Sequence, residues 1–254
     1  MLLAIDVGNT NTVMGVFDGE KLMHSWRIKT DARSTADELA LTFRGLLEEI
    51  PVSGIAACST VPAVLRELRT MLSRYYDEMP TVLVEPGVRT GVGVLMDNPK
   101  EVGTDRICNA AAAHYLIDGA CIVVDFGTST NFDCVSPRGD FVGGALAPGI
   151  EISLDALAAR AAQLSKVELV APRSPIGKNT VEALQSGILY GFAGQVDGMV
   201  RRLSAALAPQ DPSSVHVIAT GGLAALVIDH SETVTRYEPE LTLIGLRLIY
   251  ERNT

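Results

Sequence analysis

The chain has 254 residues, of which 47% are hydrophobic and 20% are charged, and its formal net charge is −9. This composition is typical of a globular α/β protein with enough apolar mass for a large core, which excludes a disordered chain. The negative charge argues against a nucleic-acid partner and against an anionic membrane surface, because both are usually met by clustered Lys and Arg.

The N-terminus and the cysteines both favour a cytoplasmic protein. The chain begins Met1-Leu2-Leu3-Ala4-Ile5-Asp6, without a basic region or a cleavage site, so we do not expect a signal peptide. No apolar run approaches the roughly 18 residues that a membrane span needs. The cysteines lack CxxC spacing and have apolar neighbours, which predicts reduced, buried thiols. These cysteines are Cys58, Cys108, Cys121 and Cys134.

A short motif occurs twice in the chain. Residues 5–12 read IDVGNTNT and residues 124–131 read VDFGTSTN, so the Asp and Gly positions of the two copies share one offset. A second short apolar run, a Gly-containing turn and a third run follow each copy, which predicts three strands joined by turns. Two halves that open alike predict a duplicated α/β fold with a ligand cleft between two lobes.

Helices and further strands are expected after the first copy. Thr35-Ala36-Asp37-Glu38 is a capping-box pattern, and the amphipathic run behind it predicts a helix to about Ile50. A strand over 55–58, a helix over 62–76, a strand over 81–84 and a helix over 105–116, which Thr104 could cap, come next. Asp118-Gly119 makes a natural seam, so the sequence predicts an N-terminal lobe over 1–117 and a C-terminal lobe over 118–254.

The second half shows the same alternation of strands and helices. We expect a helix directly after Gly149 and a long helix over 180–207. A strand over 215–219, a helix opened by Gly221-Gly222 and a final helix over 241–250 complete the chain. This order of elements is typical of the α/β class.

The repeated motif has the composition of a phosphate-binding turn with a metal anchor. Its glycine lets the backbone approach an oxyanion, and its N–H and hydroxyl groups can donate to phosphate oxygens. The carboxylate of Asp6 can hold Mg²⁺ directly or through water, and residues 125–129 offer the same groups from the other half. The alternative is a pair of hairpin turns whose polar side chains only cap backbone groups. Two matched copies favour phosphate binding.

Several common site motifs are absent from the sequence. It contains no GxxxxGK[ST] run and no strand–GxGxxG–helix unit, which argues against a P-loop enzyme and a Rossmann dehydrogenase. It also lacks HExxH, a paired Cys/His cluster and GxSxG.

Six segments follow one another in the order seen in type III pantothenate kinases. They are 6–10 (DVGNT), 97–106 (DNPKEVGTDR), 124–128 (VDFGT), 143–150 (GGALAPGI), 177–180 (GKNT) and 219–223 (ATGGL). The closing residues 241–247 (LTLIGLR) are also similar to theirs, so the resemblance covers nearly the whole chain. It implies two ribonuclease H-like lobes in tandem, the actin-like ATPase fold, each with a mixed sheet flanked by helices.

The resemblance also implies an activity and a set of site residues. A member of this family is expected to phosphorylate pantothenate to 4′-phosphopantothenate with ATP, the first step of coenzyme A biosynthesis. Asp105 resembles the general base. Asp125 resembles the site of a monovalent cation, K⁺ or NH₄⁺, and Asp6 is expected to hold Mg²⁺. The pantothenate contacts that the resemblance implies are Gly103, Thr104, Asp105, Arg106 and Thr180. The implied ATP contacts are Asp6, Val7, Gly8, Asn9, Thr10, Asn11, Thr12, Val13, Gly127, Thr128, Gly221 and Gly222. A cytoplasmic homodimer, whose substrate pocket is completed across the interface, is implied as well.

Taken by themselves, some of these residues have a purely structural explanation. Asp105 and Arg106 could complement a helix start and form a surface ion pair. Thr180 could be only a helix cap, and Gly221-Gly222 could be an ordinary strand-to-helix turn.

The chain departs from the usual family pattern at five positions that affect the fine shape of the substrate pocket. These are Leu95, Met96, Asn131, Ala161 and Ser165. None of them removes a proposed catalytic group.

Two other functions stay open: a kinase of another small hydroxylated metabolite, and a non-catalytic regulatory relative that keeps the fold. Asp6, Asp105 and Asp125 argue against the second, because an interaction protein has no chemical need for three carboxylates at these turns. An actin or chaperone-type ATPase is disfavoured, since the chain is short for their extra subdomains.

Overall fold

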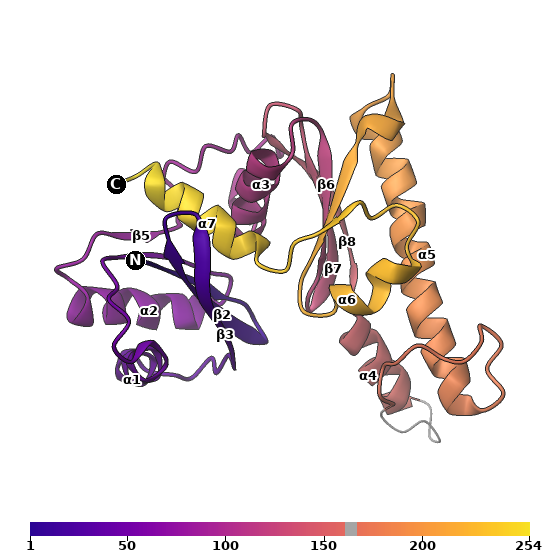
Figure 1. Ribbon diagram of the computed structural model, residues 1–254, viewed down its shortest axis with the longest axis horizontal. Coiled ribbons are helices and arrows are strands. Elements are labelled where there is room, and N and C mark those ends of the chain that lie inside the picture. Colours follow the sequence, from indigo (N-terminus) through magenta and orange to yellow (C-terminus); the bar gives the residue numbers. More distant parts are fainter. Residues whose placement is uncertain (161–166) are drawn as a thin grey trace. The chain divides into compact units, whose positions relative to one another are not determined.

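The computed structural model describes residues 1–160 and 167–254 (Figure 1). The chain forms two compact units, the first made of 1–93, 97–112 and 241–254, and the second of 94–96 and 113–240. Each unit is built on one five-stranded sheet. Within the described ranges, no helix is both long enough and apolar enough to cross a membrane.

The sheet of the first unit is mixed, with the strand order β3-β2-β1-β4-β5. The hairpin strands β1 and β3 each pair antiparallel with β2, whereas β4 and β5 run parallel to β1. The strands are β1 (Leu2–Val7), β2 (Asn11–Asp18), β3 (Lys21–Lys29), β4 (Gly54–Ser59) and β5 (Thr81–Leu83). Because β1 is central and buried on both faces, its sequence is a nearly continuous apolar run up to Asp6.

Helices cover both faces of this sheet (Figure 1). One apolar cluster joins Ile5 and Val7 of β1 to the buried faces of α1 and α2, and another joins Ala4 to the C-terminal helix α7 through Leu243 and Leu246. The helical elements are α1 (Ala36–Leu47), α2 (Pro62–Tyr75), the 3₁₀ turn η1 (Pro99–Glu101), α3 (Thr104–Leu116) and α7 (Leu241–Glu251). Because side chains alternate between the two faces of a strand, β1 contributes apolar residues to a core on each face of the sheet.

The sheet of the second unit has the same topology, with the order β8-β7-β6-β9-β10 when written from the hairpin edge. Its hairpin strands are antiparallel, and β9 and β10 run parallel to β6. The strands are β6 (Cys121–Phe126), β7 (Ser129–Val135), β8 (Phe141–Pro148), β9 (His216–Thr220) and β10 (Arg236–Tyr237). The predicted duplication is confirmed by this match of strand order and direction.

The helices of the second unit share one apolar cluster with its sheet. Ile122 and Val124 of β6 contribute to this cluster together with Phe192 and Val196 of the long helix α5. The helical elements are α4 (Ile150–Arg160), α5 (Thr180–Leu207), η2 (Pro212–Ser214), α6 (Ala224–Val227) and η3 (Ile228–His230). Figure 1 shows α4, α5 and α6 on the same side of β6 and β7.

The expected elements are found with small shifts at their ends. The capping box at Thr35 is present, but α1 ends at Leu47 rather than near Ile50. The division into lobes at residues 117 and 118 stays a prediction. The compact units divide the chain differently, because α7 packs on β1 and β4 of the first sheet, and because Val94 pairs with Phe141 in the second unit.

Candidate active site

The first copy of the motif connects β1 to β2 at the carboxyl end of the central strand. Asp6 is the penultimate residue of β1, and the N–H of Gly8 donates to the carbonyl of Asn11 over 3.0 Å. A Cβ on Gly8 would lie 3.2 Å from that carbonyl oxygen, so the turn has little room for a side chain. Asn9 and Thr10 are exposed at its tip. The turn thus presents backbone and side-chain polar groups beside a carboxylate.

The other residues predicted to contact ATP around this turn are largely part of the scaffold. Val7 is buried, and its carbonyl accepts a hydrogen bond from the N–H of Thr60 over 3.1 Å. Thr12 is also buried, and its hydroxyl pairs with that of Thr30 at 2.9 Å. Val13 lies directly opposite Asp6 on β2. A nucleotide contact from the Thr12 side chain would therefore compete with an existing hydrogen bond.

The start of α3 brings a second carboxylate to the first sheet. The hydroxyl of Thr104 donates to the carbonyl of Ser59 over 3.4 Å, which joins the first residue of α3 to the end of β4. Thr104 is therefore inside the helix and tied to the sheet. Asp105 follows it, and its Oδ1 accepts the N–H of Arg106 over 2.8 Å. A Cβ on Gly103 would lie 2.4 Å from the same oxygen, so a side chain there would displace the Asp105 carboxylate from this position.

Burial and mutual repulsion shape the charge of the two carboxylates. Burial raises the pKa of Asp6 to about 7, and the charge of Asp105 contributes to that rise. The thiol of Cys58, which donates to Asp6 Oδ1 over 3.3 Å, and the charge of Arg27 lower the pKa by smaller amounts. Burial also raises the pKa of Asp105, opposed by the N–H and charge of Arg106. Asp6 is thus partly protonated at neutral pH.

The second copy of the motif forms the corresponding turn between β6 and β7. Asp125 is the penultimate residue of β6, as Asp6 is of β1. Here the N–H of Gly127 donates to the carbonyl of Ser129 over 3.0 Å, so the connection is one residue shorter than the first. Gly127 and Thr128 are exposed. The predicted likeness of the two turns holds for the position of the carboxylate but not for the length of the loop.

Two glycines from other elements pack directly against this second turn. Gly221 has φ +92°, and a Cβ there would lie 2.5 Å from Asp125 Oδ1 and 2.7 Å from the backbone of Phe126. The N–H of Gly149, the residue before α4, donates to the carbonyl of Thr128 over 3.1 Å. A Cβ on Gly149 would lie 2.3 Å from that carbonyl oxygen. Gly149 was not among the predicted site residues, although its place directly before a predicted helix was a usable signal.

Substitution of Gly221 by alanine tests this close approach. We expect Gly221→Ala to lower the free energy of unfolding by more than the roughly 1 kcal/mol that a positive φ costs a residue with a side chain, because the new methyl group also collides with Asp125. Gly19→Ala is the matched control, since Gly19 has φ +59° and no atom within 4 Å of a Cβ. Urea unfolding of both variants measures the difference, and equal losses would contradict the packing argument.

The other predicted positions of the second unit lie at the starts of helices. Thr180 is the first residue of α5 and is exposed. The interpretation of Thr180 as a helix cap is wrong, because the side chain of Asn179 caps α5 by accepting the N–H of Glu182 over 2.9 Å. A hydroxyl that is not needed for capping is available for another partner. Gly222 directly precedes the short segment that leads into α6.

The donor set of the described residues does not build a complete protein cage for a metal. No group of three or more His, Cys, Asp or Glu side chains within these residues is placed to hold an ion. Mg²⁺ commonly keeps water and phosphate oxygens and takes only one or two carboxylates, so a single Asp6 fits it. A monovalent cation is commonly held by carbonyl oxygens, so the single carboxylate of Asp125 beside backbone carbonyls fits that group as well.

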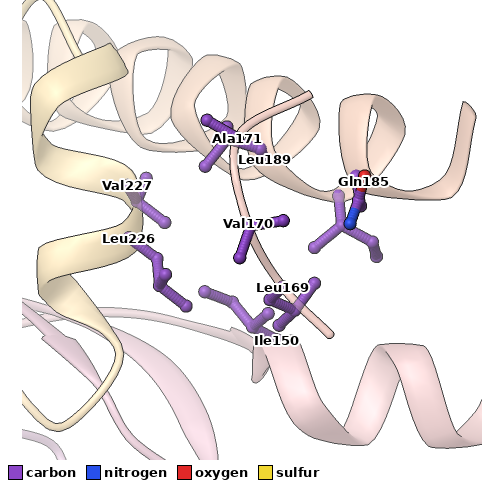
Figure 2. Close-up of a pocket in the computed structure, with 9 residues that line it drawn as sticks. Ile150, Leu169, Val170, Ala171, Gln185, Leu189, Leu226 and Val227 are labelled. Carbon is purple, nitrogen blue, oxygen red and sulfur yellow. The ribbon is translucent and has the colours of Figure 1, made fainter. Parts of the chain in front are cut away.

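An apolar pocket lies in the second unit between α4, α5 and α6 (Figure 2). Its lining residues are Ile150, Leu169, Val170, Ala171, Gln185, Ile188, Leu189, Leu226 and Val227. Among these, Gln185 carries the polar side chain, and its Nε2 donates to the carbonyl of Glu168 over 2.9 Å. No charged group lines the pocket, so it does not suit a phosphate or a carboxylate. The pocket lies between α4 and α6, which are the helices that follow Gly149 and Gly222.

Three of the five departures from the family pattern lie in the described structure. The N–H of Leu95 donates to the carbonyl of Phe141 over 2.8 Å, and its side chain is 56% exposed. The Met96 sulfur would lie 3.3 Å from a Cβ on Gly143. Asn131 pairs with Asp125 across the second hairpin. The remaining two, Ala161 and Ser165, lie outside the described residues.

Comparison with known sequences places this geometry in a family context. The sequence profile described as "Type III pantothenate kinase" matches residues 2–202. A protein of Frankia casuarinae named "Type III pantothenate kinase" is 67% identical over 253 residues, which cover 100% of each chain. The matched region spans the sequences of both units.

Solved structures share the fold at low sequence identity. A chain from Campylobacter jejuni described as a Baf family transcriptional activator has a TM-score of 0.60 at 18% identity, with coverage of 99% of this chain and 98% of that one. An inorganic polyphosphate/ATP-glucomannokinase from Arthrobacter has a TM-score of 0.55 at 15% identity, with coverage of 100% and 99%. The predicted fold is confirmed: two ribonuclease H-like lobes in tandem, the actin-like ATPase fold, each with a mixed sheet flanked by helices.

Proposed function

Because this chain belongs to the type III pantothenate kinase family, we propose that it transfers the γ-phosphoryl group of ATP to the primary hydroxyl of pantothenate. The product is 4′-phosphopantothenate, and the reaction is the first step of coenzyme A biosynthesis. The observation that carries the proposal is that the charge of Asp105 acts on the buried carboxylate of Asp6, which lies at the end of β1 just before the turn at Gly8.

In this proposal Asp105 is the general base. The pantothenate hydroxyl gives its proton to the Asp105 carboxylate while its oxygen bonds to the γ-phosphorus, and the bond from that phosphorus to the β–γ bridging oxygen breaks to release ADP. The raised pKa of Asp105 makes its carboxylate a better proton acceptor than an ordinary surface aspartate. Because phosphoryl transfer has a loose transition state, placement and charge neutralisation contribute more than base strength.

The remaining residues divide into groups that bind and orient. Residues 6–13 with Gly127, Thr128, Gly221 and Gly222 hold the nucleotide, and Mg²⁺ at Asp6 would supply charge neutralisation for the phosphates. Gly103, Thr104, Arg106 and Thr180 contact pantothenate, with the Arg106 guanidinium suited to a carboxylate. Asp125 holds a monovalent cation. The protein works in the cytoplasm, which fits its free, buried cysteines.

A coupled assay of ATP consumption tests the proposal directly. Adding pantothenate to the protein with Mg·ATP should start turnover, and K⁺ should stimulate it relative to Na⁺ at equal ionic strength. A panel of sugars and other small alcohols provides the comparison. If the rate with pantothenate is negligible and another alcohol is phosphorylated, that alcohol is the substrate instead of pantothenate. If no alcohol of the panel is phosphorylated, the assignment as a kinase is overturned.

The glycines of α5 support the proposed homodimer. Gly187, Gly191 and Gly194 recur at helical spacing, and no atom lies within 4 Å of a Cβ built on any of them. Each glycine destabilises a helix by roughly 1 kcal/mol relative to alanine. A contact with a second copy of the chain along these three glycines would compensate for this loss of helix stability. Exposed apolar side chains belong to the same unit and would suit such a contact. They include Ile152, Leu157, Ile176 and Val181.

We therefore expect Gly191→Leu to fold and yet to shift the protein from dimer to monomer, with activity falling because the pocket is completed across the interface. Sedimentation velocity measures the shift. Gly45→Leu is the matched control, because Gly45 of α1 is also exposed and has no atom within 4 Å of a Cβ. A Gly191→Leu protein that stays dimeric at wild-type affinity would remove α5 from the interface.

A further inference from the structure

Cys58 lies directly beside the carboxylate that the proposed function assigns to the metal. It occupies β4 in register with Asp6 on the neighbouring parallel strand β1, so the two side chains project from the same face of the sheet. The distance from Cys58 Sγ to Asp6 Oδ1 is 3.3 Å. Within the described residues this is the hydrogen bond that the Asp6 side chain makes, and Cys58 is fully buried.

The Cys58 thiol is able to donate a hydrogen bond at neutral pH. An ordinary cysteine thiol has a pKa of about 8.5, so its sulfur carries a proton there. A thiol has one proton, and a carboxylate oxygen accepts it better than a second sulfur does. The S–H of Cys58 is therefore directed to Asp6.

This hydrogen bond restricts the rotation of a carboxylate that ends a strand. Asp6 is the penultimate residue of β1, and its Oδ1 is held by the Cys58 thiol. Holding Oδ1 leaves the other carboxylate oxygen as the one presented to a ligand. Without the hydrogen bond from Cys58, the Asp6 side chain would lose rotational freedom when the metal–nucleotide complex binds. This loss of entropy would weaken binding of the complex.

We propose that Cys58 is a positioning residue of the kinase, which orients the Asp6 carboxylate for the Mg·ATP complex through its thiol hydrogen bond. The proposal rests on the proposed function. It differs from a packing role, which Cys58 also has: it belongs to the apolar cluster with Ala4, Ala56 and Leu243. A packing role changes stability, whereas a positioning role changes how much Mg²⁺ the nucleotide complex requires.

The test compares Cys58→Ala and Cys58→Ser in the full-length protein. Calorimetry measures the binding of a non-hydrolysable ATP analogue across a Mg²⁺ series, and the coupled assay measures kcat and the KM values in parallel. We expect Cys58→Ala to weaken Mg²⁺-dependent analogue binding about tenfold, as for a hydrogen bond to a charged group, with the KM for pantothenate little changed. Cys58→Ser keeps a donor and should recover binding to within about threefold of wild type.

Cys121→Ala is the matched control. Cys121 is equally buried and occupies β6, but it lies at the start of that strand, away from Asp125 at its end. It should lose stability as Cys58→Ala does while keeping the wild-type Mg²⁺ dependence. Cys58→Val, which fills the space without a donor, replaces the alanine variant if that does not fold.

Wild-type Mg²⁺ dependence in Cys58→Ala or Cys58→Val, or failure of Cys58→Ser to improve on them, would overturn the positioning role. Analogue binding needs no pantothenate, so failure of the proposed substrate would be seen separately, in the wild-type coupled assay.

Discussion

We expect Asp105→Asn to phosphorylate pantothenate about 10²- to 10⁴-fold more slowly than wild type at saturating Mg·ATP and pantothenate. The substitution keeps the shape of the side chain and the acceptor for the Arg106 N–H, but an amide cannot take the proton of the attacking hydroxyl. Binding of the ATP analogue should stay close to wild type or improve, because removing the Asp105 charge also relieves the repulsion that Asp6 experiences. Steady-state kinetics and calorimetry measure the two quantities.

A matched control separates this effect from the loss of a helix-start charge. Asp37 occupies the first turn of α1 as Asp105 occupies the first turn of α3, and it is paired with Arg74 on the protein surface. Asp37→Asn should keep activity within about twofold, since surface ion pairs contribute little. If Asp105→Asn keeps more than a tenth of the wild-type rate with pantothenate, Asp105 is not the base.

The topology of both sheets could be predicted from the sequence because the information is local. Each copy of the motif ends an apolar strand, contains a glycine at the turn and is followed by two more short runs. These signals are the ones that specify a hairpin, and they placed Asp6 and Asp125 at matching positions of β1 and β6. The difference in length between the two loops could not be predicted from the sequence, because whether Ser129 belongs to the turn or to β7 depends on pairing across the sheet.

The surroundings of Asp6 could not be predicted, because they depend on contacts distant in sequence. Cys58 reaches Asp6 only through the parallel register of β1 and β4, and Asp105 approaches through the bond from Thr104 to Ser59. No periodicity encodes such a register. The packing of α7 on the first sheet could not be predicted for the same reason. The amphipathic pattern of a helix shows which of its faces is buried, but it does not show which sheet covers that face.

The second large effect is expected at Asp6. Asp6→Asn should reduce turnover at least 10²-fold, because the amide loses the negative charge that attracts Mg²⁺. The same substitution should make the ligand-free protein more stable at pH 8. A carboxylate that the fold holds with a raised pKa is a functional group that opposes folding when no cation is bound, and its removal relieves that cost.

The sign follows from the two states of Asp6. In the unfolded chain its pKa is about 3.9, and in the folded protein it is raised to about 7. Between these values the folded state keeps a proton that the unfolded state releases, so wild-type stability falls as pH rises from about 4 to 7 and stays reduced above 7. At about 1.4 kcal/mol per pKa unit the full cost is at most about 4 kcal/mol, and Asp6→Asn removes it.

Urea unfolding in EDTA at pH 5 and pH 8 measures this difference. The advantage of Asp6→Asn over wild type should be largest at pH 8 and should shrink at pH 5, where the folded wild type already carries the proton. Adding Mg·ATP should reverse the order at pH 8, because only the wild-type carboxylate gains a cation. Asp18→Asn, at the exposed far end of β2, should follow the wild type in both activity and pH dependence. An Asp6→Asn protein that is less stable than wild type at pH 8 without ligand would mean that the Asp6 charge supports the fold, and the case for a cation at this carboxylate would then lose its electrostatic basis.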